Sequence, residues 1–199
     1  MEINTDTDTT NSNKGTGAGG ANTNKNGKSF EEKTNNESRL LNKGFIRENI
    51  NIGNKAKTNY YLKSPDNGDI IYLTQGAMKS YFETFFNIKM CRNPDEAYLC
   101  KSGDKYILKV LEKKNQNNPG SVDTKLLSGP GFIEEYKFIL GDKFDIKYAF
   151  CISSYLKEEY NSDKIKYQAL RATNKKYDIS VLFGDDPDYY DKLDEWINI

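Results

Sequence analysis

The sequence predicts a mixed α/β domain with one central β-sheet. Two observations support this class: runs of strand-forming residues alternate along the chain with amphipathic segments of helical period, and the two kinds of segment are not separated into blocks. A third is size, since 199 residues with 36% hydrophobic and 13% aromatic content suit a single sizeable core. We therefore expect one domain preceded by a tail.

The tail comprises residues 1–26, which are mostly Asn, Thr, Gly, Asp and Lys. Such a segment has too little apolar surface to offset the entropy of ordering it. We expect it to be disordered, and the domain to cover residues 27–199.

The first expected element is a helix in "GKSFEEKTNNESRLLNKGF", where Phe30, Thr34, Glu37 and Leu41 fall on one face. An irregular stretch follows. Two short strands are then predicted at "NYYLK" and "DIIYLT", residues 59–63 and 69–74.

An amphipathic helix is expected over residues 75–86, with Met78, Phe82 and Phe85 directed inward. Next, "DEAYLC" and "KYILKVLEKK" are rich in strand formers, and "KSGD" between them provides a turn. These segments predict an antiparallel hairpin of residues 95–100 and 105–114.

The second half of the chain alternates strands and helices. "SGPG" interrupts a helical candidate, so that either one helix starts near Ser121 or a short segment precedes a better helix from about Phe132. A buried strand is expected from residue 145, running into helical residues 157–176. A last strand in 177–184 and a closing helix from Pro187 complete the order.

The composition excludes several kinds of chemistry. Histidine is absent, which removes Ser-His and Cys-His nucleophile pairs, histidine metal ligands and a histidine general base. Lys+Arg and Asp+Glu are balanced at 29 each, so a nucleic-acid-binding surface would have to be a local patch. Any catalysis must depend on carboxylates, lysines and tyrosines.

Location is expected to be intracellular. The three cysteines are odd in number and lie in apolar surroundings, as reduced buried thiols do. The first residues have no signal-peptide pattern, and no apolar run approaches the length of a membrane span. We expect a soluble, cytoplasmic protein without a membrane partner.

Two carboxylates come together in the predicted hairpin. Centring the turn between Gly103 and Asp104 places Asp95 directly opposite Glu112. Because side chains alternate along a strand, Glu112, Lys114 and Gln116 share one face, while Leu111 takes the other. Asp95, Glu112 and Lys114 are therefore expected to form one patch.

Opposed carboxylates repel each other unless a cation lies between them. Hard oxygen ligands suit Mg²⁺ or Mn²⁺, and an adjacent lysine could neutralise a phosphate or poise a water molecule. The alternative is an exposed hairpin whose acids and lysines alternate because one face is wet, a common pattern in a chain with 29% charged residues.

The "PD" of Pro94-Asp95 followed by the "EKK" of Glu112-Lys113-Lys114, on a hairpin preceded by the helix of "GKSFEE", resembles the PD-(D/E)XK nuclease superfamily. This superfamily is best known from type II restriction endonucleases. The resemblance covers roughly residues 27–152. It implies a restriction-endonuclease-like central mixed β-sheet flanked by helices.

The resemblance also implies roles for individual residues. Asp95 and Glu112 would ligate a catalytic Mg²⁺, with Mn²⁺ as a substitute, and the backbone carbonyl of Lys113 would complete the coordination. Lys114 would orient or activate the attacking water. Glu31 would add an acid from the first helix, a role for which Glu37 competes.

Further contacts are expected around this patch. Gln116, on the face of Lys114, could contact a phosphate or order a water molecule. Ser121 at a helix start is a candidate phosphate seat, which helix capping explains equally well. Lys113 and Lys125 could extend the patch along DNA, although solvated lysines are the default.

The expected function is therefore a Mg²⁺-dependent DNA endonuclease resembling type II restriction enzymes, which act commonly as homodimers. Two alternatives stay open: a non-catalytic module of the same fold that binds DNA or a protein, and a repair or recombination nuclease that recognises DNA structure. The chain has only four arginines, Arg39, Arg47, Arg92 and Arg171, which leans toward AT-rich targets or shape recognition.

Overall fold

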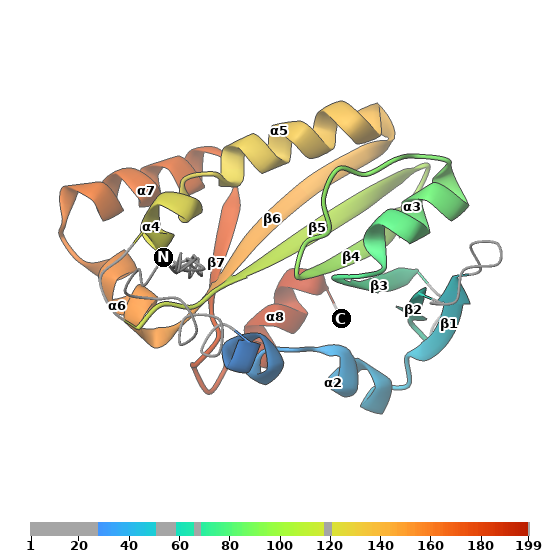
Figure 1. Cartoon of the computed structure of the whole chain (residues 1–199), viewed down its shortest axis with the longest axis horizontal. Helices are drawn as coiled ribbons and strands as arrows, with labels where there is room; N and C mark the ends of the chain where they lie inside the picture. Colours follow the sequence, from blue (N-terminus) through green and yellow to red (C-terminus); the bar gives the residue numbers. More distant parts are fainter. Residues whose placement is uncertain (1–27, 51–58, 66–68, 118–120, 199) are drawn as a thin grey trace, which may run out of the picture.

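One mixed sheet of seven strands organises the chain (Figure 1). The computed structural model describes residues 28–50, 59–65, 69–117 and 121–198; the tail predicted at residues 1–26 lies outside them. The strands lie in sequence order: β1 (Ile46–Ile50), β2 (Asn59–Lys63), β3 (Ile70–Thr74), β4 (Glu96–Ser102), β5 (Lys105–Lys114), β6 (Phe144–Ile152) and β7 (Ile179–Phe183). The predicted α/β class, a mixed sheet flanked by helices, is confirmed.

The sheet changes direction at β5. Strands β1 to β5 pair antiparallel, whereas β5, β6 and β7 pair parallel. Parallel neighbours need long crossover connections. Helices form the connection from β5 to β6 and the connection from β6 to β7. The crossovers contain α4 (Val122–Leu126), α5 (Gly129–Leu140) and the short 3₁₀ helix η1 (Gly141–Lys143), then α6 (Ser154–Asn161) and α7 (Ile165–Lys176).

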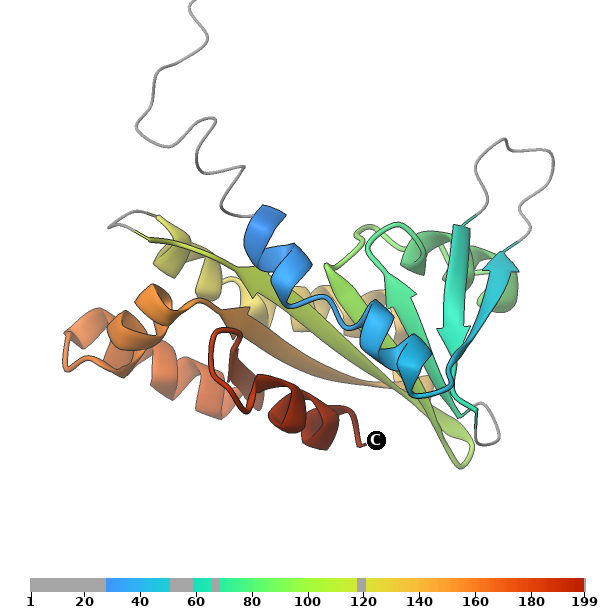
Figure 2. The same cartoon turned by 90° about the horizontal axis from the view of Figure 1, so that it is seen from below.

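Each face of the sheet has its own hydrophobic core. Buried residues of α3 (Met78–Phe86), α5, α6 and α7 pack on one face, against strand residues such as Leu108 and Val110. The opposite face holds Phe30 of the helix at 28–33, with α2 (Glu37–Asn42) and α8 (Tyr189–Ile197), which pack around Leu111. Figure 2 shows the helix at 28–33, α2 and α8 together on this second face.

The hairpin register agrees with the prediction. Glu96 pairs with Leu111 and Ser102 with Lys105, so the turn is Gly103-Asp104. Gly103 has a φ of 59°, a left-handed conformation that glycine adopts without steric cost. The sequence predicted that Asp95 lies within the strand, but Asp95 immediately precedes β4. Continuing the register by one residue from the Glu96–Leu111 pair still places Asp95 opposite Glu112.

The prediction of one continuous first helix is wrong, because the structure has two helices there. A helix covers residues 28–33, and α2 begins only at Glu37, with a turn between them. Because of this break Leu40, fully buried, takes the core position expected of Leu41, which is 40% exposed. The stretch expected to be irregular contains β1, which lies at one edge of the sheet.

Other differences concern helix ends and single side chains. Met78 and Phe82 are buried as expected, but Phe85 is 50% exposed. The segment around "SGPG" forms two helices, and α5 begins at Gly129, earlier than Phe132, with a proline in its first turn. The helical stretch after β6 is divided into α6 and α7, and Cys91 is exposed rather than buried.

Candidate metal and nuclease site

The predicted site lies where β4 begins and β5 ends, beside the strand at which the sheet changes from antiparallel to parallel pairing. Glu112 and Lys114 are near the C-terminal end of β5, and their side chains lie on the same face of the strand as those of Leu108 and Val110. The structure brings Asp95, Glu112 and Lys114 together, as the hairpin geometry predicted.

The lysine lies beside both carboxylates. Lys114 Nζ donates to Glu112 Oε2 at 2.7 Å and lies 4.0 Å from Asp95 Oδ2. The three side chains are only 14–22% exposed, so water screens their interaction weakly. The Lys114 ammonium therefore reduces the repulsion between the Asp95 and Glu112 carboxylates.

Asp95 is held by two further contacts. Its Oδ2 accepts a 2.7 Å hydrogen bond from the backbone N–H of Lys113, and its Oδ1 accepts one of 3.3 Å from Gln75 Nε2. Gln75 follows β3 directly. Sequence reasoning did not select Gln75, because its distance from Asp95 in the chain gave no signal of contact.

The environment of Glu112 disfavours its charge. Burial raises the pKa of Glu112 above its usual 4.5; the Lys114 ammonium opposes this rise, and the charge of Asp95 adds to it. A divalent cation bound here would stabilise the carboxylate form.

Glu31 lies near this patch, on the helix at residues 28–33. It lines a cavity of about 250 Å³ together with Asp95 and Gln75. Partial burial raises the pKa of Glu31, and the nearby charge of Asp95 raises it further. Glu37 lines the same cavity, but its Oε1 already accepts a 2.6 Å hydrogen bond from Tyr60. This contact favours Glu31 over Glu37 as the additional acid.

The side chain of Lys113 lies on the opposite face of β5 from Glu112. It is 3% exposed, and its Nζ donates to Glu96 Oε1 at 2.6 Å. A buried, paired ammonium cannot reach along a DNA backbone, so the DNA contact expected of Lys113 is not retained. Its backbone carbonyl stays a candidate metal ligand.

The remaining predicted contacts are less closely linked to the patch. Gln116 follows β5, and its backbone N–H donates to Ser153 Oγ at 3.3 Å. Ser121 and Lys125, at the start and within the last turn of α4, are exposed. Their expected roles stay predictions.

The residues present fit a hard divalent cation. Within the described ranges, no group of three or more Asp, Glu or Cys side chains is close enough to hold a metal. Asp95 and Glu112 would therefore supply two carboxylates, with the Lys113 carbonyl and water completing the set, as is usual for Mg²⁺. In this structure Lys114 supplies the positive charge beside the two acids.

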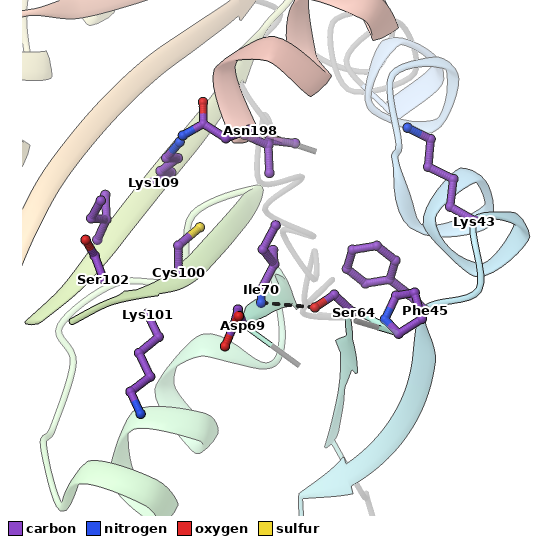
Figure 3. A pocket seen from close by; sticks show the side chains of 13 residues that line it. Lys43, Phe45, Ser64, Asp69, Ile70, Cys100, Lys101, Ser102, Lys109 and Asn198 are labelled. Atoms are coloured by element: carbon purple, nitrogen blue, oxygen red, sulfur yellow. Dashed lines mark hydrogen bonds between the residues drawn. The ribbon is translucent and has the colours of Figure 1, made fainter. Parts of the chain in front are cut away.

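A larger cavity, of about 600 Å³, lies at the far end of the same hairpin (Figure 3). Lys43, Cys100, Lys101 and Lys109 are among its lining residues. Lys109 is 5% exposed, and its ammonium donates to the Trp196 carbonyl, near the end of α8, at 2.6 Å. The positive charge of Lys109 thus stabilises the C-terminus of α8.

Comparison with models of protein families, with curated proteins and with solved structures finds no match to this chain. The class that the fold defines is therefore the coarser one, an α/β domain with a seven-stranded mixed sheet flanked by helices. None of the helices in the described part of the chain has the length and apolar character needed to cross a membrane.

Proposed function

We propose that the chain is a Mg²⁺-dependent DNA endonuclease of the PD-(D/E)XK type, related in design to type II restriction enzymes. One observation carries the proposal: the Lys114 ammonium lies within 4.0 Å of carboxylate oxygens of both Asp95 and Glu112, at the C-terminal end of β5, an interior strand of the mixed sheet. In a chain without histidine, carboxylates and lysines such as these are among the groups that could serve phosphodiester hydrolysis.

Asp95 and Glu112 would hold the ion, with the backbone carbonyl of Lys113. Bound Mg²⁺ would stabilise charge on the phosphate and lower the pKa of a water molecule, so no covalent intermediate is needed. Lys114 would donate a hydrogen bond to the attacking water or to a phosphate oxygen. Glu31 lines a cavity together with Asp95 and would add a further carboxylate near the site.

DNA is the proposed substrate, and a homodimer would let each subunit cut one strand. A non-catalytic module that binds DNA or a protein is the competing function, and a structure-specific repair or recombination nuclease is the other. An inactive relative would be expected to have lost one of the three central groups, whereas Asp95, Glu112 and Lys114 are all present and in contact.

The test is cleavage of mixed plasmid and phage DNA by the purified protein with Mg²⁺. EDTA and Glu112→Ala should each abolish cleavage, while Glu83→Ala, which removes an exposed acid from α3, should leave it intact. Discrete bands would indicate sequence recognition. Absence of cleavage on duplex, branched and single-stranded DNA by folded protein would overturn the proposal and favour the binding module.

A further inference from the structure

The cavity of about 600 Å³ at the far end of the β4–β5 hairpin is lined by both apolar and basic residues. Its volume lies within the range of about 300–1,000 Å³ that is typical of small-molecule sites. The apolar contacts come from Phe45, Ile70, Ile107 and Ile197. Among the described residues, three lysines but only one acid, Asp69, line the cavity. This combination of lining residues suits a ligand that is apolar over most of its surface and negatively charged at one end.

Lys109 is the buried lysine of the cavity, since Lys43 and Lys101 are exposed. Its ammonium donates to the Trp196 carbonyl at 2.6 Å, and no carboxylate within the described ranges forms an ion pair with it. Figure 3 shows Lys109 beside Asn198, whose amide oxygen accepts from the ammonium at 3.1 Å once the amide is turned to its hydrogen-bonding orientation. An ammonium has three donors, so one N–H of Lys109 has no acceptor in the described part of the chain.

The charge of Lys109 is only partly compensated. A buried ion without a counter-charge is costly to a fold. The C-terminus of α8 carries the equivalent of about half a negative elementary charge, which is less than the full charge of the ammonium. Burial accordingly lowers the pKa of Lys109 below its usual 10.5. An anion bound in the cavity would supply the negative charge that the protein lacks at this position.

The lining residues favour a single carboxylate over a phosphate. No arginine is among the lining residues that the structure describes, and arginine is the side chain that binds phosphate in a bidentate manner. Lys43 is already paired with Asp194 at 2.6 Å. Lys101 lies on the opposite face of β4 from Cys100, and Figure 3 shows its side chain directed away from Lys109. Lys109 is thus the one buried cation of the described lining, which matches one negative charge.

We propose that this cavity binds a small monocarboxylate with an apolar body, of the kind that medium-chain fatty acids represent. The carboxylate accepts a hydrogen bond from the Lys109 ammonium, and the apolar body packs against Phe45, Ile70 and Ile107. The cavity lies at the opposite end of the hairpin from the candidate metal site, so the inference does not rest on the proposed nuclease function.

The experiment is isothermal titration calorimetry of the full chain with decanoate, below the concentration at which the probe forms micelles. Decanol, which has the same apolar chain without the charge, should bind at least tenfold more weakly. Lys109→Met removes the ammonium and keeps an unbranched side chain. It should weaken decanoate binding about 10–100-fold, as loss of a hydrogen bond to a charged group does, and leave decanol binding nearly unchanged. The matched control is Lys137→Met, which removes an exposed lysine of α5 on the other face of the sheet and should leave decanoate affinity unchanged.

Cysteine labelling locates the ligand within the chain. Cys100 lines the cavity, whereas Cys91 is exposed and is not among the lining residues described. Decanoate should slow the alkylation of Cys100 by N-ethylmaleimide, measured by peptide mass spectrometry, and leave the alkylation of Cys91 unchanged. If Lys109→Met does not fold by circular dichroism, Cys100→Trp takes its place: it fills the cavity without removing the charge and should abolish decanoate binding.

Four results would overturn the inference. They are no binding of decanoate to the wild-type protein, decanol binding as tight as that of decanoate, a folded Lys109→Met variant with affinity within about twofold of wild type, and equal protection of Cys100 and Cys91. None of these results bears on the proposed nuclease function, because none involves a divalent ion or DNA. Failure of DNA cleavage would likewise leave the decanoate measurements as the test of this cavity.

Discussion

Gly184, which follows β7, is packed closely between Phe30 of the helix at 28–33 and Cys151 of β6. A Cβ at this position would lie 2.7 Å from Phe30 Cζ, 2.7 Å from Thr34 Cγ2 and 2.8 Å from Cys151 Sγ. The backbone of Gly184 is not left-handed, so the substitution Gly184→Ala tests packing and not backbone strain. Phe30, Thr34 and Cys151 are all buried, which leaves them little room to yield.

The expected cost follows from these distances. Each neighbour would have to retreat by roughly 0.6–0.7 Å to reach ordinary contact, in an interior packed as densely as a crystal. Overpacking of this kind costs about 1–3 kcal/mol. In a chain of this length, 1 kcal/mol corresponds to about 2–4 °C in Tm, so Gly184→Ala should lower Tm by roughly 2–12 °C.

Gly131→Ala is the matched control, because the added Cβ on exposed Gly131 of α5 meets no atom within 4 Å. It should raise the free energy of unfolding by about 0.5–1 kcal/mol through helix propensity. Differential scanning calorimetry measures both. If Gly184→Ala unfolds within 1 °C of wild type, the close packing of the helix at 28–33 on the sheet is refuted; the threshold is below the smallest shift expected.

Three further predictions concern single groups near the site. Tyr98→Phe should cost about 1–3 kcal/mol because it removes a hydroxyl that donates to Glu96 Oε2 and accepts from the Asn36 side chain in the buried interior. Tyr148→Phe should be neutral or stabilising in thermal unfolding, since the buried Tyr148 hydroxyl has no hydrogen-bond partner among the described residues. Burial raises the pKa of Glu112, so the charged form of Glu112 destabilises the fold at higher pH. Glu112→Gln should therefore raise Tm near neutral pH, and this gain in Tm should vanish as the pH falls toward 4.5. An equal gain in Tm at neutral pH and at pH 4.5 would contradict a raised pKa of Glu112. Lys114→Met should lower the cleavage rate about 100-fold or more, as expected for loss of a group that assists proton movement or charge stabilisation, while Mn²⁺ binding measured by titration persists. Loss of both cleavage and Mn²⁺ binding would indicate instead that Lys114 helps to bind the ion.

The hairpin and its site were predictable because their signals are local. A two-residue turn fixes the register of both strands, and that register alone placed Asp95 beside Glu112. The alternation that put Glu112 and Lys114 on one face also assigns Lys113 to the opposite face with Leu111. The alternation along β5 therefore predicted that Lys113 is buried, but its charge led us to expect an exposed side chain.

The contacts made by the first helix were not predictable in the same way. The break before α2 depends on Asn36, whose backbone N–H donates to Glu96 and whose side chain donates to Tyr98, both about 60 residues away. Helical periodicity is a property of neighbouring residues and contains no information on such partners. The same reason explains why Gln75 was not selected as a partner of Asp95.

The most direct test of the site is an anomalous difference map from crystals grown with Mn²⁺, because it needs no knowledge of the DNA sequence that is cut. The account predicts a peak bonded at about 2.1 Å to a carboxylate oxygen of Asp95 and of Glu112, with Glu31 and the Lys113 carbonyl nearby. The peak should be absent in Glu112→Ala crystals. A map without density between Asp95 and Glu112, or with its peak at another acidic cluster, would contradict the account.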